Sequence, residues 1–405
     1  MQAPKGTFDV LPEDGGRLEL FHLTEAVFEP AGYGYIETPA FEETELFARG
    51  VGESTDIVQK EMFTFEDMGG RSLTLRPEGT APVCRAYVEH GMHKRPQPVR
   101  LWYWGPFFRH EAPQAGRFRQ FAQIGTEVLG SDDPAIDVEV IALLADLLDR
   151  AGARELRLRL SSLGTAETRR EYAEELKQFL RGRADELAPD VQARIDANPL
   201  RAFDSADSDT QAVMKEAPTL LDRLSEDDAQ HFAEVRGLLD DAGIAYEVDA
   251  ALVRGLDYYT RTVFEFTSDA LGAQSGVGGG GRYDRLVEHL GGPPTPAIGW
   301  AAGVERILLA GNDALGRKSE TEVFIAVPKD ERRREAFRVW CQLRRERSVL
   351  MGEPGRSMKG QMKQADRAGA RWAVIVEDDG FELKDMESGE QRAVATTDEL
   401  LEALR

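Results

Sequence analysis

The chain has 405 residues, of which 41% are hydrophobic and 8% aromatic, a composition typical of a globular protein with roughly two to four domains. It contains no apolar leader and no run approaching the length of a membrane span, so we expect a soluble, cytoplasmic protein. The net charge of −22 argues against general nucleic-acid binding, because contacts with phosphate need clustered lysine and arginine.

The pattern along the first half of the chain predicts a sheet flanked by helices. Residues 17–30 have apolar side chains at helical spacing, whereas GYGYIETPAF (32–41) is typical of a strand. Residues 72–92 change from strand alternation to a helix that begins near Thr80–Pro82. Two β-rich runs joined by the turn-forming EAPQAGR predict a long antiparallel hairpin, followed by a helix and a strand, at 99–110, 118–129, 136–150 and 155–164.

Residues 165–245 are highly charged and show almost no strand signal, which predicts an inserted helical subdomain. Strand alternation returns over 246–268, where TRTVFEF alternates regularly. We then expect a glycine-rich turn, a helix over 282–290 and a helix that includes GWAAGVERILLAG (299–311).

A break near 316–321 separates a final α/β segment of about 85 residues, in which strands and helices alternate. The expected strands are TEVFIAVP, RWAVIVED and FELKDM, and the expected helices span 332–347, 357–369 and 397–404. Residues 329–371 carry 13 lysines and arginines against 6 acidic residues, a local charge of +7. Such a segment is typical of an RNA-facing surface or of a solvated amphipathic helix.

The two cysteines, Cys84 and Cys341, lie far apart and belong to no CxxC or Cys/His cluster. We therefore expect neither a disulfide framework nor a zinc site, and interpret both as small buried hydrophobic residues.

The run GVGGGG (276–281) formally matches the dinucleotide fingerprint GxGxxG. The preceding strand alternates like a half-buried one, however, and its distance from the glycines is too long for the tight turn of a Rossmann unit. Close approach of the backbone to some other ligand, or a plain flexible turn, are the interpretations that stay open.

Four arginines stand in apolar or glycine-rich surroundings, where each is either a ligand for phosphate or carboxylate or an ordinary ion-pair partner: Arg109, Arg117, Arg254 and Arg306. Glu78, Gln123 and Glu127 lie on the predicted sheet and helix starts. They are candidates for binding an ammonium group and a polar ring, with structural hydrogen bonding as the alternative.

Together these segments give the chain a resemblance to histidyl-tRNA synthetases, a family of class II aminoacyl-tRNA synthetases. The resemblance runs nearly end to end, from KGTFDVLPED (5–14) to GRSMKGQMKQADRAGARWAVIVED (355–378), and RGLDYYT followed by GGGRYD is its most specific part. The class I signatures HIGH and KMSKS are absent. The other matching segments are LRPEGTA (75–81), FFRHEAPQAGRFRQF (107–121), QIGTEVLG (123–130), LVRGLDYYTRTVFEF (252–266), GGGRYDRL (279–286) and AIGWAAGVERIL (297–308).

The resemblance implies an α+β catalytic domain over 1–318, with an antiparallel sheet flanked by helices and a helical insertion at about 165–245. An α/β anticodon-binding domain would occupy 321–405. It also implies a homodimer, since GYGYIETPAF is similar to the family's dimer-forming motif.

The implied reaction activates L-histidine with ATP to histidyl-adenylate and transfers the histidine to the 3′ end of its tRNA. The attacking carboxylate is already an anion, so catalysis rests on positioning and charge neutralisation. The catalytic residues would be Arg109 and Arg254, with Mg²⁺ bridging the phosphates and no metal-binding residue identified. ATP would be bound by Arg109, Glu111, Arg117 and Arg306, and histidine by Glu78, Thr80, Arg109, Gln123, Glu127, Arg254, Tyr258, Tyr259 and Tyr283.

Within this set, Glu127 and Tyr259 would hydrogen-bond to the donor and the acceptor nitrogen of the imidazole. The α-ammonium group would be bound by Glu78, Thr80 and Gln123. One departure affects the loop that would meet the tRNA acceptor end, where Ala112 replaces the family's usual arginine and Gln114 is retained. The alternative is a synthetase-like regulatory subunit of ATP phosphoribosyltransferase that does not charge tRNA. Another class II synthetase or a non-catalytic relative is disfavoured by the pair Glu127 and Tyr259.

Overall fold

The computed structural model describes residues 1–12, 14–52, 55, 57–112, 116–196, 199–205, 207–252, 256, 258–272, 275–311, 314–315, 321–353 and 355–404, the side chains of residues 201 and 204 excepted. The chain divides into two compact units, Met1–Gly316 and Arg317–Arg405. Each unit is described by itself.

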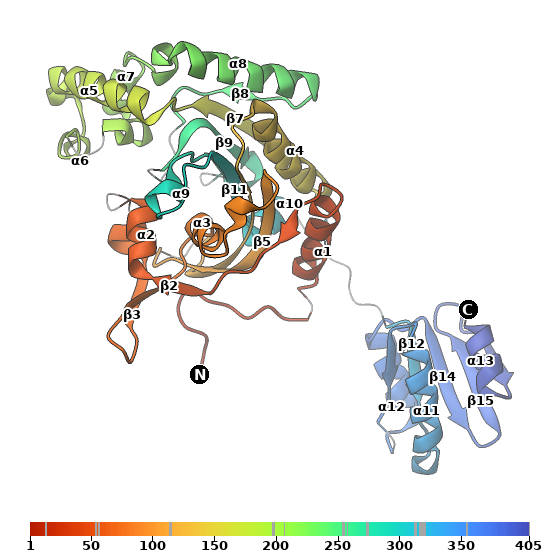
Figure 1. Ribbon diagram of the computed structural model, residues 1–405. Helices are drawn as coiled ribbons and strands as arrows, with labels where there is room; N and C mark the ends of the chain where they lie inside the picture. Colours follow the sequence, from red (N-terminus) through yellow and green to blue (C-terminus); the bar gives the residue numbers. More distant parts are fainter. Residues whose placement is uncertain are drawn as a thin grey trace. The chain divides into compact units, whose positions relative to one another are not determined.

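Within the described residues, the first unit is built on an eight-stranded sheet with the order β1-β5-β6-β11-β10-β9-β7-β8 (Figure 1). Neighbouring strands run antiparallel, except that β1 pairs with β5 and β7 with β8 in parallel at the two edges. The strands are β1 (Gly34–Tyr35), β5 (Val99–Phe108), β6 (Gln120–Leu129), β7 (Leu156–Ser162), β8 (Glu247–Val248), β9 (Thr260–Ser268), β10 (Gly276–Arg282) and β11 (Ala297–Gly303).

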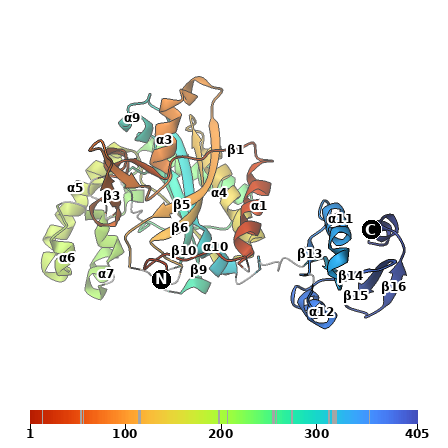
Figure 2. The ribbon, with the colours of Figure 1, turned by 90° about the horizontal axis from the view of Figure 1, so that it is seen from below.

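Alternation along the strands gives this sheet two buried faces, each covered by helices (Figures 1 and 2). On one face, Trp102, Ile124 and Trp300 pack in a core with α1 (Gly16–Phe28), α4 (Pro134–Arg150), α8 (Glu226–Asp241) and α10 (Val304–Gly311). On the other face, residues such as Leu101 and Val263 pack with α3 (Thr80–Glu89) and α9 (Leu286–His289).

A smaller antiparallel sheet stands beside the large one, with the order β2-β4-β3. It is formed by β2 (Phe41–Glu43), β3 (Phe63–Glu66) and β4 (Ser72–Leu75), and α2 (Thr44–Val51) follows β2 directly. The chain passes from β4 into α3, so this sheet sets the position at which α3 begins.

The helical character predicted for residues 165–245 is confirmed. It consists of α5 (Ala166–Gly182), α6 (Pro189–Gln192), α7 (Ser208–Met214), α8 and short 3₁₀ turns. Apolar residues of α5 and α7, such as Leu176 and Val213, pack together in the core on the α3 side of the sheet. By contrast, Phe232 and Val235 of α8 join the opposite core, where α8 lies along α4.

The predicted α+β class with an antiparallel sheet is confirmed, and so are the helices at α1, α3 and α4, the β5–β6 hairpin and strand β7. Of the two cysteines, Cys84 is fully buried as expected, whereas Cys341 is only half-buried.

Several predicted elements were wrong in extent or type. Among the described residues, the strand expected over 246–268 is limited to β8 and β9. The strand expected over 32–41 is limited to Gly34–Tyr35, and the helix expected over 282–290 is limited to Leu286–His289. The first part of the helix expected over 299–311 is strand β11. The glycine-rich turn is strand β10, in the middle of the sheet. A side chain has no room there: a Cβ on Gly280 would lie 1.9 Å from the carbonyl oxygen of Gly299 on β11.

The second unit is an α/β fold with the strand order β13-β12-β14-β15-β16, in which β13, β12 and β14 are parallel. Helices α11 and α13 cover one face and α12 the other. The predicted α/β class is confirmed, but the short strands β13 and β16 were not predicted. The elements are β12 (Val323–Ala326), α11 (Arg333–Leu343), β13 (Val349–Met351), α12 (Met358–Arg367), β14 (Trp372–Glu377), β15 (Gly380–Asp385), β16 (Gln391–Val394) and α13 (Thr397–Ala403).

Candidate active site

A buried carboxylate stands at the centre of the sheet face that α3 covers. Glu127 of β6 is fully buried, and three hydroxyl groups donate hydrogen bonds to it. Tyr283 donates to Oε2 at 2.5 Å, while Thr80 and Tyr103 donate to Oε1 at 2.8 and 3.3 Å. A carboxylate offers about four acceptor positions, so this group retains capacity for a further donor.

Glycines on neighbouring strands make the room for this cluster. Gly299 of β11 pairs with Glu127, and a Cβ on Gly299 would lie 1.8 Å from Glu127 Oε2. Gly125 pairs with Tyr103, and its Cβ would lie 2.1 Å from the Tyr103 ring. Burial raises the pKa of Glu127 to about 8, with the three hydroxyl donors opposing that rise. The sheet thus encloses a polar group in a space cleared by glycine.

A second buried carboxylate, Glu78, lies at the start of α3. Its Oε2 and Oε1 accept hydrogen bonds from the backbone N–H groups of Thr80 and Ala81, at 2.7 and 3.0 Å. These are among the first N–H groups of the helix, which have no partners within the helix itself. Burial raises the pKa of Glu78, while its N–H donors and the positive charge of Arg109 act in the opposite direction.

Three tyrosine rings close the space around the carboxylates. The ring of Tyr258 lies 4.7 Å from that of Tyr259 and 5.7 Å from that of Tyr283, measured between centroids. All three residues are buried. Burial holds the pKa of Tyr258 and of Tyr283 well above the ordinary value, so both phenols are neutral donors at physiological pH.

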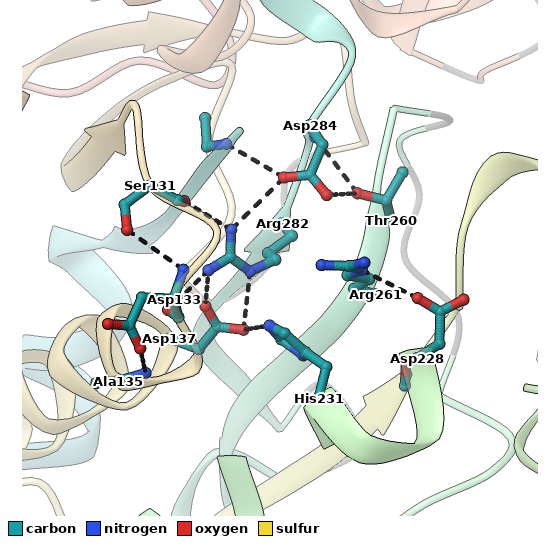
Figure 3. A network of polar contacts seen from close by, with 12 residues as sticks. Ser131, Asp133, Ala135, Asp137, Asp228, His231, Thr260, Arg261, Arg282 and Asp284 are labelled. Carbon is teal, nitrogen blue, oxygen red and sulfur yellow. Dashed lines mark hydrogen bonds and ion pairs between the residues drawn. The ribbon is translucent and has the colours of Figure 1, made fainter. Parts of the chain in front are cut away.

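A buried arginine fixes the chain just before Tyr283 (Figure 3). Arg282, at the end of β10, is fully buried and donates from Nε to Asp137 Oδ2 at 3.0 Å. It also donates to the carbonyl oxygens of Ser131 and Asp133, at 2.9 and 3.0 Å. With its charge paired and three acceptors engaged, Arg282 anchors the segment from which Tyr283 reaches Glu127.

Next to this cluster lies a cleft that is open to solvent. Arginines from three parts of the chain line the cleft: Arg109 after β5, Arg117 before β6 and Arg306 in α10. The other lining residues are Glu111, Gly116, Phe118, Phe121, Gln123, Glu265, Gly276, Val277, Gly278, Gly279, Ala301, Gly303 and Glu305.

The arginines are held by the walls of the cleft. Arg109 donates from Nε to the carbonyl oxygen of Pro77 at 2.9 Å, and its guanidinium lies 5.2 Å over the Phe121 ring. Arg306 donates from Nε to the carbonyl oxygen of Gly276. Burial lowers the pKa of Arg306, and the nearby charge of Arg117 lowers it further. Two cations that repel each other across an open cleft favour an anionic ligand between them.

The structure brings the sequence-predicted residues into two adjoining groups. Glu78, Thr80, Glu127, Tyr258, Tyr259 and Tyr283 form the buried cluster, and Arg109, Glu111, Arg117, Gln123 and Arg306 line the cleft. Among the described residues, Gln123 Oε1 is buried without a hydrogen-bond partner, so it is an acceptor at the cleft wall. Arg254 and Gln114 lie outside the described residues.

Two residues of the site were missed by the sequence reasoning: Tyr103, which donates to Glu127, and Phe121, which lies beneath Arg109. A signal for Tyr103 exists in the hairpin register. Gly125 stands directly opposite it, and a glycine facing a large aromatic residue within a paired strand indicates that the ring lies across it.

Comparison with known proteins decides the family. The histidyl-tRNA synthetase family matches residues 6–307. The chain belongs to the histidyl-tRNA synthetase family. A curated histidine–tRNA ligase of Rubrobacter xylanophilus is 52% identical over 97% of this chain and 96% of that protein. The ligase of Thermosynechococcus vestitus is 47% identical over 100% and 96%. The apo histidyl-tRNA synthetase structure from S. aureus aligns with a TM-score of 0.83 at 35% identity, covering 100% of this chain and 99% of that one.

In the parts of the chain that the structure describes, no helix is both long and apolar enough to cross a membrane.

Proposed function

We propose that the protein is a histidine–tRNA ligase, which forms histidyl-adenylate from L-histidine and ATP and then transfers the histidyl group to histidine tRNA. The observation that carries this proposal is the buried Glu127, held by three hydroxyl groups beside an arginine-lined cleft. Such a carboxylate suits the N–H of a polar ring, and the cleft suits a polyphosphate.

The histidine side chain would enter the buried cluster. Glu127 would accept a hydrogen bond from one imidazole nitrogen, and the Tyr259 hydroxyl would complement the other. A site built around polar groups rejects analogues that leave those groups unpaired by roughly 10⁴–10⁵-fold, so this arrangement needs no editing site. The α-ammonium would lie among Glu78, Thr80 and Gln123, of which Gln123 Oε1 is a buried acceptor without a described partner.

The triphosphate would occupy the cleft. Arg109 would neutralise the α-phosphate and the histidine carboxylate, with Arg254 as its counterpart, while Arg117 and Arg306 would bind the terminal phosphates. Glu111 lies 3.3 Å from Arg117 and would orient that guanidinium. Because β10 presents glycines to the cleft, the backbone there is open to close approach by the nucleotide.

In the first step, a histidine carboxylate oxygen forms a bond to the α-phosphorus, and the bond from that phosphorus to the bridging oxygen of pyrophosphate breaks. In the second step, a ribose hydroxyl at the 3′ end of the tRNA attacks the activated carbonyl, and AMP leaves. Neither step needs a nucleophile from the protein. The residues contribute position and charge, which are the main terms in phosphoryl and acyl transfer of this kind.

Mg²⁺ would neutralise charge on the phosphates when it is bound with ATP. The described residues contain no group of three or more potential protein ligands. The cleft nevertheless has the carboxylates of Glu111 and Glu265 on its wall. One or two carboxylates together with substrate phosphates are the usual ligands of Mg²⁺ in nucleotide sites, so the residues present fit an ion carried in with ATP.

For tRNA binding we propose the anticodon-binding role for residues 321–405 and the catalytic role for residues 1–318, in the cytoplasm. The basic segment 329–371 supports the first assignment, because Arg334, Arg338 and Arg345 are exposed. Phosphate contacts of this kind are largely electrostatic.

We further propose a homodimer. Aromatic residues of the short edge strand β1 and of the small sheet, Tyr35, Phe41 and Phe65, are exposed, which is typical of surfaces covered by a partner. Light scattering of the purified protein tests this, since a mass of one chain would contradict it.

The function itself is tested by charging. The purified protein is incubated with ATP, labelled histidine and unfractionated tRNA, and acid-precipitable label is counted. We expect histidine to be attached to tRNA and to be released by mild base, as an ester is. A regulatory subunit of ATP phosphoribosyltransferase would attach none.

A further inference from the structure

The backbone between Tyr259 and Arg261 connects the buried cluster to the helical segment that begins after β7. The N–H of Leu163 donates to the carbonyl oxygen of Arg261, and the N–H of Arg261 donates to that of Gly164, both at 2.7 Å. Arg261 has a φ of 44°, an uncommon value for a residue other than glycine. The segment is therefore held in an unusual conformation by contacts with the start of the helical insertion.

A side-chain ion pair reinforces this junction (Figure 3). Arg261 donates from Nε to Asp228 Oδ1 at 3.0 Å, and Asp228 is fully buried near the start of α8. The other oxygen of Asp228 accepts from the backbone N–H of Thr165 at 3.0 Å. The Asp228 carboxylate thus joins β9 to the start of α5. If β9 moved away from α8, the buried charge of Asp228 would lose its partner Arg261.

A second arginine reaches from α5 to the residue before the strand. Arg169 donates from Nη1 to the carbonyl oxygen of Tyr259 at 2.8 Å. The Tyr259 ring packs against Tyr258 and close to Gly281, where a Cβ would come within 3.0 Å of the ring. The peptide that Arg169 binds is therefore the one that carries a ring of the proposed imidazole site.

From these contacts we propose that Arg169 is a positioning residue for histidine. By fixing the Tyr259 carbonyl it sets the direction of the Tyr259 side chain, so the position of α5 controls the affinity for histidine. The proposal rests on the proposed function, and it adds a specificity-determining contact that lies outside both the buried cluster and the cleft.

The test compares Arg169→Met with Arg170→Met in histidine-dependent ATP–pyrophosphate exchange. Arg170 is the next residue of the same helix, is 74% exposed and pairs only loosely with Glu167, at 3.6 Å. For Arg169→Met we expect the KM for histidine to rise about tenfold, as loss of one charged hydrogen bond predicts, with the KM for ATP unchanged. Arg170→Met is expected to match the wild type.

Arg169→Lys keeps a cationic donor and is expected to give an intermediate KM for histidine; it carries the test if Arg169→Met does not fold. A wild-type KM for histidine in Arg169→Met, or in Arg169→Lys where the methionine variant does not fold, would overturn the proposal. So would an equal rise in the KM values for histidine and ATP, which indicates a general structural role. If the wild-type protein itself shows no histidine-dependent exchange, the proposed function is refuted instead.

Discussion

Replacement of Glu127 by glutamine is the most informative change in the buried cluster. The side chain keeps its size, but one of the two carboxyl oxygens becomes an NH₂ group that faces one of the three hydroxyl donors. The imidazole N–H loses its carboxyl acceptor. A buried donor without a partner costs about 1–3 kcal/mol, and weaker hydroxyl contacts add about 1 kcal/mol. The expected loss of about 2–4 kcal/mol corresponds to roughly a 30- to 1000-fold fall in kcat/KM for histidine.

The assay is ATP–pyrophosphate exchange at varied histidine and saturating ATP, with Glu139→Gln as the matched control. Glu139 is a partly buried carboxylate on α4, bound by Tyr33 and Arg100. Glu139→Gln should leave the kinetics of histidine unchanged. If Glu127→Gln stays within about threefold of the wild type, Glu127 does not bind the substrate ring and the reasoning fails.

Three further predictions concern stability and the phosphate site. Because burial raises the pKa of Glu127 from 4.5 to about 8, its folded form retains a proton that the unfolded chain has lost. The contribution of this proton to the free energy of unfolding is complete below pH 4.5 and is lost as the pH rises through 8. Glutamine does not titrate, so the free energy of unfolding of Glu127→Gln in urea should depend less on pH in this range than that of the wild type. Gly299→Ala places a Cβ 1.8 Å from Glu127 Oε2 and should lower the unfolding free energy by about 1–3 kcal/mol. Gly182→Ala, with no atom within 4 Å, is its neutral control, and equal stability of the two would contradict the packing argument. Arg254→Ala should abolish exchange without changing thermal unfolding, and near-wild-type exchange would remove Arg254 from the mechanism.

Local patterns were sufficient for much of the fold. The β5–β6 hairpin has long β-rich runs around a turn-forming loop, and α4 has clear helical periodicity, so both were predicted close to their observed bounds. The α/β character of the second unit followed in the same way from alternating strands and helices. In these segments local preference and the final fold agree.

The glycine-rich strand could not be predicted from local preference. Glycine disfavours strands, so GVGGGG suggests a turn, yet β10 lies between two long neighbours that supply its pairing. Glycine is needed there because β10 and β11 leave no room for a side chain, as at Gly280. This close approach of the two strands arises only in the tertiary structure. The same applies to GWAAG, the last five residues of β11, whose small residues gave no strand signal.

The candidate site was assembled from the sequence largely through family resemblance, because its residues come from segments far apart in the chain. Arg109 was singled out by its apolar context and Glu127 by its place on a predicted strand, whereas Tyr283 was named only through the resemblance. Tyr103 is indicated only by the glycine opposite it in the hairpin, and Arg169 looks ordinary in the sequence. The structure brings these two residues to Glu127 and to the Tyr259 carbonyl. Long-range contacts of this kind leave no periodic trace in the chain.

Activation of histidine by this site is measured by ATP–pyrophosphate exchange with the purified protein, run separately with each of the common amino acids. We expect exchange that depends on histidine and on no other amino acid. No exchange with histidine, or faster exchange with another amino acid, would contradict this expectation.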